Sequence, residues 1–191
     1  MQTNKEKVIK MPTGDINKDL EIIEKVSLNT LKTVGTLNPT LYIIGKEYAH
    51  IISGQGLPET NEERKAIFAN IGEKMGIKMP EAYGFVAVLE AWSSTAKKGD
   101  KISPPREDPE RVETLIISAR KANGDALFLM KPFKKVDGKI KLVAAQGGLK
   151  ELNSLGWIKH GDTDPDKRVE DSLMTELWTK FKLSAMLNNL K

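Results

Sequence analysis

Four charged residues in the middle of the chain have types and spacing that suit acid–base or metal chemistry. Glu90 ends an apolar run, and Asp108, Arg111 and Glu113 follow across one loop. Because an ionised carboxylate in an apolar strand is costly unless paired, we expect Glu90 to be buried beside a cation, with Arg111 as its partner. The three carboxylates could bind Mg²⁺ or act as general acid and base. The simpler alternative is a structural ion pair between Glu90 and Arg111.

A second candidate site is a group of lysines around the Asp137-Gly138 turn, with one aromatic side chain among them. Its members are Lys131, Phe133, Lys134, Lys135, Lys139 and Lys141. A basic two-stranded ribbon can follow a nucleic-acid groove or a single strand, where lysines neutralise phosphates and a ring stacks on a base. One ring and few arginines favour binding that is independent of base sequence. The alternative is that the lysines protect an exposed sheet edge from aggregation.

The third candidate is an apolar stripe near the end of the chain. Leu173, Leu177, Trp178 and Phe181, with Leu187 beyond them, recur at helical spacing. We expect this stripe to cover the chain's own sheet. The alternative is a surface for a protein partner or for a second copy of the chain.

The composition narrows the chemistry further. The chain has 191 residues, no cysteine and two histidines, His50 and His160, which lie far apart in the sequence. Disulfides, thiolate zinc sites, iron–sulfur clusters and cysteine nucleophiles are excluded, and we expect no metal or cofactor. No stretch reaches the roughly 18 apolar residues of a membrane span. We therefore expect a cytoplasmic protein that does not engage membranes.

The distribution of charge points to the middle of the chain. The net charge is +4, and the whole positive excess falls within residues 91–150. Such a local excess attracts phosphate groups, although a basic surface that serves solubility gives the same count.

Helical and extended patterns alternate along the first half of the chain. Apolar spacing predicts a helix over residues 15–34, with Asp15 as its N-cap and Gly35 after its end. Two β-branched runs, 40–44 and 48–52, predict a hairpin. Thr60 and Glu63 form a capping box that opens a second helix, which we expect to place Ile67 inward and to end near Met75, with Gly76 as its stop.

The second half is mainly extended. Residues 83–92 predict a strand buried on both faces, and residues 111–119, 126–133 and 139–144 predict a meander with tight turns at Asn123-Gly124 and Asp137-Gly138. A last helix is expected over residues 169–190. The sequence therefore predicts an α+β fold whose mainly antiparallel sheet, an N-terminal hairpin plus a C-terminal meander, is covered on one face by two or three helices.

The expected domain organisation is simple. Residues 1–14 form a loose, flexible leader, residues 15–150 a single α+β domain, and residues 151–191 an acidic loop followed by the C-terminal amphipathic helix.

Residues 85–120 resemble a family of uncharacterised proteins from bacteria and their phages. The resemblance rests on a strand ending in Glu90-Ala91-Trp92, a proline-rich loop, Asp108-Pro109-Glu110-Arg111 with Glu113 after it, and an apolar strand. The predicted hairpin and second helix also fall where that family has them, so the resemblance covers roughly half of the chain. It implies a phage or mobile-element setting and no particular reaction.

Together these patterns favour a non-enzymatic accessory or interaction protein that binds nucleic acid, or another protein, through the basic ribbon. The alternative is a metal-dependent hydrolase or nuclease built on Glu90, Asp108 and Glu113. Convergence of the three carboxylates in one open cleft would favour the alternative.

Overall fold

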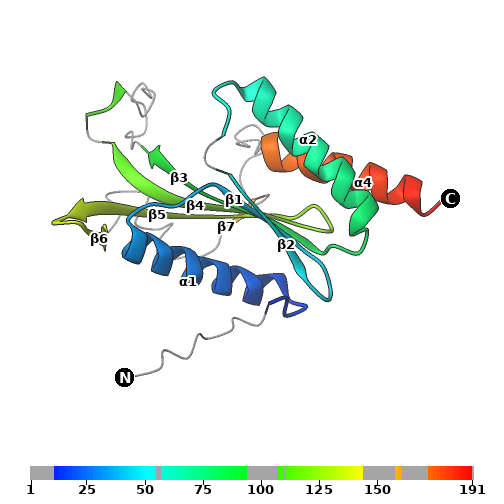
Figure 1. The fold of residues 1–191 in the computed structure, drawn as a ribbon, viewed down its shortest axis with the longest axis horizontal. Coiled ribbons are helices and arrows are strands. Elements are labelled where there is room, and N and C mark those ends of the chain that lie inside the picture. The colour runs from blue at the N-terminus through cyan, green and yellow to red at the C-terminus, as the bar shows by residue number, and fades with distance from the viewer. Residues whose placement is uncertain are drawn as a thin grey trace.

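A seven-stranded antiparallel sheet forms the centre of the fold (Figure 1). The computed structural model describes residues 11–54, 57–93, 107–109, 111–143, 158–160 and 172–190. The strands are β1 (Thr40–Ile44), β2 (Ala49–Ser53), β3 (Gly84–Ser93), β4 (Val112–Lys121), β5 (Ala126–Val136), β6 (Lys139–Leu142) and β7 (Ile158–His160). Their order is β2-β1-β3-β4-β5-β6, and β7 pairs with the start of β5. The predicted hairpin and meander are thus confirmed, whereas β7 is an additional strand.

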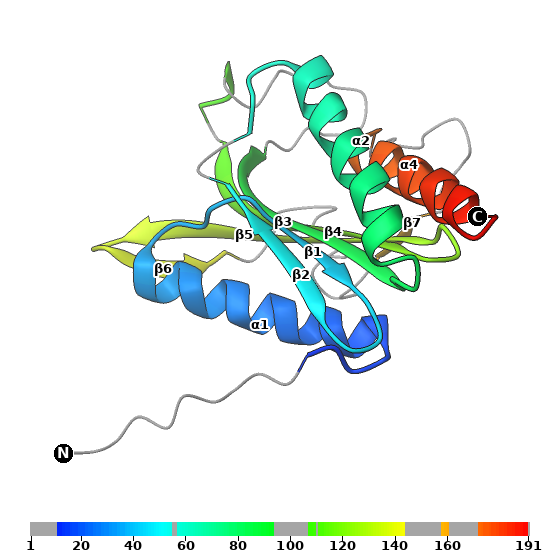
Figure 2. The same cartoon turned by 45° about the vertical axis from the view of Figure 1, so that its right-hand side comes forward.

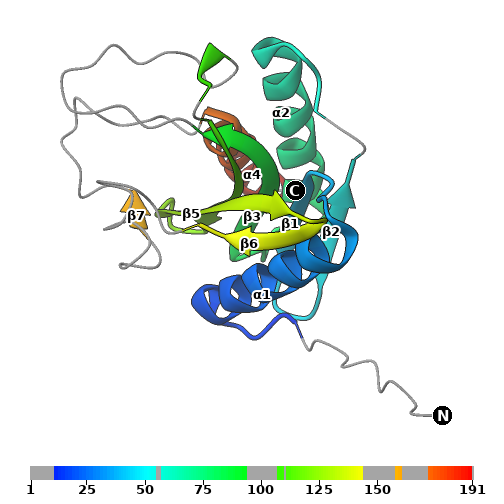
Figure 3. The same cartoon turned by 90° about the vertical axis from the view of Figure 1, so that its left-hand side faces the viewer.

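Within the described ranges, three helices cover this sheet, and they cover both of its faces. Helix α1 (Ile16–Val34) lies on one face, while α2 (Asn61–Lys78) and α4 (Ser172–Asn188) lie together on the other (Figure 3). The α+β class is as expected, but the prediction of one covered face is wrong. The physical reason is that both alternating sets of side chains in β3 are apolar, so each face needs its own cover.

Strand β3 shows this directly. Phe85 and Ala87 belong to the core cluster under α2 and α4, and Val86 and Val88 belong to the cluster under α1. Successive side chains of a strand point to opposite faces, so one continuous apolar run supplies two cores. The expectation of a strand buried on both faces is confirmed.

Helix α1 has the ends that its sequence predicts. The Oδ1 atom of Asp15 accepts a hydrogen bond from the backbone N–H of Asn17 at 3.0 Å. At the other end Gly35 has a φ of 86°, and its N–H donates to the carbonyl of Leu31 at 2.9 Å. This left-handed conformation favours glycine and terminates the helix.

Helix α2 begins as expected and ends later. The Thr60 hydroxyl accepts from the Glu63 N–H at 3.3 Å and donates to the Glu63 carboxylate at 2.8 Å, as a capping residue does. The predicted stop at Gly76 is wrong, because the helix continues to Lys78. A Cβ on Gly76 would lie 2.4 Å from the carbonyl oxygen of Phe181 in α4, and one on Gly72 would lie 2.2 Å from that of Leu177.

These two glycines therefore serve helix packing. They lie one turn apart on the same side of α2, where α4 runs alongside it (Figure 2). The absence of side chains there lets the two backbones approach closely. Ile67, which was expected to face inward, is instead 42% exposed.

The segment before α1 is held in place, contrary to the expectation of a loose leader through residue 14. The Thr13 N–H donates to Asp19 Oδ1 at 2.8 Å, and the Gly14 N–H donates to the Tyr83 hydroxyl at 3.0 Å. Tyr83 in turn donates to Asp19 Oδ2 at 2.5 Å. The buried Asp19 carboxylate thus joins the segment to the start of β3. Residues 1–10 of the expected leader lie outside the described residues.

We expect this junction to make folding stability fall at high pH. Burial, and then the hydrogen bond to Asp19, raise the pKa of Tyr83 to about 12. Between about pH 10 and 12 the unfolded tyrosine therefore loses its proton while the folded one keeps it, so stability declines as pH rises. Urea unfolding at both ends of this range should show a smaller decline for Tyr83→Phe than for wild type.

The exposed Tyr48 provides the control, because Tyr48→Phe removes a phenol that has no contact with Asp19. An equal decline in wild type and Tyr83→Phe would assign the loss at high pH to other groups, such as lysines.

Candidate functional site

The Glu90 carboxylate lies where the end of β3 meets the segment after α1. One of its oxygens, Oε2, accepts from the backbone N–H of Leu37 at 3.1 Å and from the Thr36 hydroxyl at 3.3 Å. The other, Oε1, lies 3.3 Å from the Lys135 ammonium. The Glu90 side chain is 17% exposed, so this residue is largely buried and is paired with a cation, as expected.

Lys135 bridges two carboxylates from neighbouring strands. Its Nζ lies 3.3 Å from Glu90 and 3.1 Å from Glu113, which lies in β4. Burial acts to lower the pKa of this lysine, but the hydrogen bonds to Glu113 and Glu90 outweigh it and raise the pKa above its usual value. The ammonium is therefore held in its charged form, which makes it a structural cation between two acids.

Arg111 does not take the place expected for it. Its guanidinium lies 3.7 Å from the centre of the Trp92 ring, a close cation–π contact at the end of β3. The prediction that Arg111 is the partner of Glu90 is therefore wrong, and Lys135 is the partner instead. The alternation along the sheet explains this, since Glu113 pairs with Phe133 and Lys135 is the next residue on the same face.

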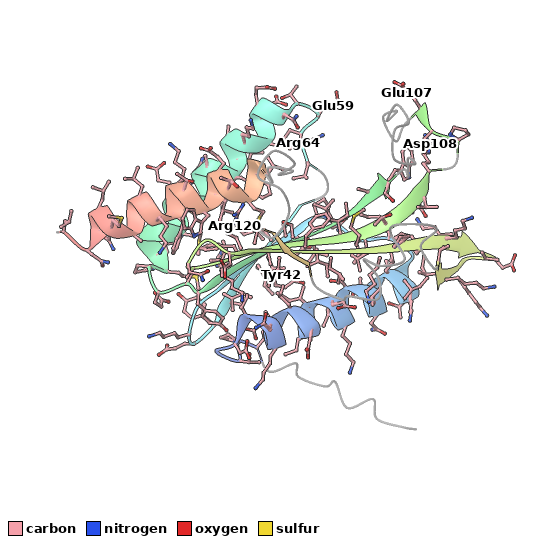
Figure 4. All side chains as sticks on the ribbon, turned by 180° about the vertical axis from the view of Figure 1, so that it is seen from behind. Tyr42, Glu59, Arg64, Glu107, Asp108 and Arg120 are labelled. Atoms are coloured by element: carbon pink, nitrogen blue, oxygen red, sulfur yellow. The ribbon has the colours of Figure 1, made fainter. Side chains whose placement is uncertain are left out.

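The proposed metal-binding carboxylates do not converge. Within the described ranges, no group of three or more histidine, aspartate and glutamate side chains is arranged to hold a metal ion. Glu90 and Glu113 share Lys135, whereas Asp108 lies on the segment that leads into β4, where its carbonyl accepts from the Arg111 N–H at 3.2 Å (Figure 4). The arrangement neutralises two carboxylates and does not assemble three, so the geometry does not favour the hydrolase hypothesis.

Strands β5 and β6 form the predicted basic ribbon, but its lysines lie on two different faces of it. On the α1 side, Lys131 pairs with Glu24 of α1 at 2.8 Å, and Lys135 is held by its two carboxylates. Phe133 lies beside them and is 0% exposed. The prediction that Phe133 stacks on a base is therefore wrong, because its ring is already part of the packed interior.

The remaining three lysines lie on the opposite face of the ribbon. Lys134 of β5 pairs directly with Lys141 of β6, and Lys139 lies two residues from Lys141, so all three project to one side. All are exposed, and none forms an ion pair with any residue that the structure describes. We call Lys134, Lys139 and Lys141 the lysine face.

The apolar stripe of α4 packs inside the protein. Leu177 and Phe181 are buried, and the Phe181 ring meets that of Phe85 edge to face at 4.7 Å. Leu173 and Trp178 pack against the same cluster. The covering role is thus confirmed and leaves Leu177 and Phe181 no surface for a partner, whereas Leu187, assigned to the stripe, is 54% exposed.

Comparisons with known proteins add nothing to this geometry, because no family model, curated protein or solved structure matches the chain. Among the described helices, none combines the length and the apolar character needed to cross a membrane.

Proposed function

We propose that the chain is a cytoplasmic, non-enzymatic accessory protein of phage or mobile-element type that binds nucleic acid through the lysine face. The observation that carries the proposal is the pairing of Lys134 with Lys141 across the β5–β6 ribbon. Like charges directly opposite each other destabilise a strand pair. A phosphate chain lying along the ribbon would relieve that repulsion.

The geometry also favours contact with phosphates over contact with bases. Lysine ammonium groups are point charges on flexible stems and carry little base selectivity. The aromatic ring that lies among these lysines, that of Phe133, is buried and cannot stack. Binding should therefore be independent of sequence and should weaken steeply with salt.

Replacing Lys134, Lys139 and Lys141 together by alanine tests the proposal. If each lysine contacts one phosphate, the logarithmic salt dependence of binding should flatten by about 2 units for single strands and about 3 for duplex. Affinities should be measured by fluorescence anisotropy with labelled oligonucleotides of several sequences, from about 50 mM salt upward. All sequences should lose affinity alike.

The chain offers a matched control on α1. Lys18, Lys25 and Lys32 are exposed, and replacing them by alanine lowers the net charge by the same amount. This control should bind as wild type does. Absence of binding by wild type, or equal loss in both triple variants, would overturn the proposal and leave edge protection as the role of the lysines.

A further inference from the structure

A cavity separate from the lysine face lies between α1 and the β1–β2 end of the sheet. Its volume is about 250 Å³, a little below the roughly 300–1,000 Å³ of drug-sized ligand sites. Figure 4 shows Tyr42, one of its lining residues, between the sheet and α1. The side chains that line it are all uncharged, and six of them carry a hydroxyl group: Ser27, Thr30, Thr36, Thr40, Tyr42 and Ser53.

Three of the hydroxyl groups that line the cavity, those of Thr36, Thr40 and Ser53, already have partners within the protein. The Thr36 hydroxyl donates to Glu90, and the Thr40 hydroxyl lies 3.2 Å from that of Ser53. Thr40 also donates to the carbonyl of Asn38 at 3.0 Å. These contacts join the loop after α1 to Glu90 of β3 and join the start of β1 to the end of β2.

The hydroxyl groups of Ser27 and Tyr42, which also line the cavity, are different. Ser27 lies on the inner side of α1 and is 3% exposed, yet its hydroxyl makes no hydrogen bond with any residue that the structure describes. The same holds for the hydroxyl of Tyr42 on the facing strand. Burial raises the pKa of Tyr42, which keeps this phenol neutral and able to donate. Ser27 is buried and Tyr42 is half-buried, but neither hydroxyl oxygen is among the enclosed polar atoms without a partner, so both are open to the cavity.

This chemistry selects the kind of ligand. A hydroxyl that is open to the cavity and has no partner within the protein can bond a ligand that both donates and accepts, in place of water. A charged ligand would lose hydration with no opposite charge on the cavity wall to replace it. Apolar side chains such as Val26 and Val88 line the rest and suit the carbon skeleton of such a molecule. We propose that the cavity binds a small neutral polyol of monosaccharide size, recognised by the hydroxyl groups of Ser27 and Tyr42.

Ligand-observed saturation-transfer NMR on the full chain tests this. The probes are D-glucose, D-mannose, N-acetyl-D-glucosamine and myo-inositol, each at about 10 mM, which suits a Kd of about 1 mM. At least one should show transfer, and glucose 6-phosphate should show none. In the labelled protein, the neutral probe that shows transfer should shift the amide signals of Ser27, Thr30 and Tyr42. The amide signals of the lysine face should stay unchanged.

Variants then separate recognition from general stickiness. Ser27→Ala and Tyr42→Phe should each weaken binding of the positive probe about 2- to 10-fold, the usual range for one hydrogen bond. Thr33→Ala removes a hydroxyl on the same helix that is bonded to Asn29 at 2.9 Å and does not line the cavity, so it should bind as wild type does. Thermal melts identify any variant that fails to fold. If a variant does not fold, the amide shifts of the wild-type protein test whether the probe binds in the cavity.

Absence of transfer from all four neutral probes would overturn this proposal, as would equal binding by the Ser27→Ala/Tyr42→Phe double variant. Neither result bears on nucleic-acid binding, because the two surfaces share no residue.

Discussion

Removal of residues 169–191 should unfold the protein or make it aggregate. Helix α4 contributes Met174, Leu177, Phe181 and Ala185 to the core on one face of the sheet, and all four are buried. Without them the apolar side chains of α2 and β3 beneath would meet water. Because a domain of this kind has a total stability of only about 5–15 kcal/mol, the loss of one core layer exceeds what the fold can tolerate.

A single substitution gives the same test in graded form. Phe181→Ala should lower the free energy of unfolding by about 3–5 kcal/mol, since it leaves a large cavity against Phe85. Leu183→Ala is the control, because Leu183 lies on the same helix and is 53% exposed. Urea unfolding measures both. A shortened chain that stays monomeric with an unchanged Tm would show that α4 is dispensable, against the packing described above.

The elements themselves could be predicted because their signals are local. Each helix-end signal depends only on residues within one helical turn of it. Asp15, Gly35 and the Thr60–Glu63 pair each have the capping role that their residue types suggest. The layers could not be predicted in the same way. The apolar run of β3 requires cover on both faces, but the sequence does not say which helix lies on which side. That choice depends on long-range packing, such as the contact between Phe85 and Phe181.

The candidate sites show the same limit. The sequence identifies Glu90 as a carboxylate that needs a cation, and the structure provides one. To predict Lys135 as the partner of Glu90, the register of three strands must be known, because Lys135 comes from β5. Arg111 is nearer to Glu90 in the sequence, but it contacts the Trp92 ring instead. Side chains alternate between the two faces of the ribbon, so among the described residues the lysines of one face form ion pairs and those of the other face do not. A count of charges alone conceals that division.

Gly76 is the clearest case in which a local rule misleads. Glycine near the end of an apolar helical pattern usually marks a C-cap, and that rule predicts a stop. Here Gly72 and Gly76 lie within α2 because the backbone of α4 passes over them. The signal that could have indicated this is their spacing of four residues, which brings two small residues to one side of a helix.

The close approach of the two helices makes a second large effect testable. Gly72→Ala would place a Cβ 2.2 Å from the carbonyl oxygen of Leu177 and 3.0 Å from its carbonyl carbon, both of them backbone atoms. Alanine gains about 1 kcal/mol of helix propensity over glycine, but overpacking costs about 1–3 kcal/mol where the neighbour cannot move. We expect a net loss of stability, and a larger one for Gly72→Leu.

The control for this effect is Asn70→Ala on the same helix. Asn70 is exposed, so the substitution gains propensity without any clash and should leave stability equal or slightly higher. The comparison separates helix propensity from packing, because both substitutions add an alanine to α2 and only one places its Cβ against α4. If Gly72→Ala raised the Tm as Asn70→Ala does, α2 and α4 would have to lie further apart than the contacts of Leu177 and Phe181 require. The apolar layer that α4 contributes to the sheet would then be looser than its burial indicates.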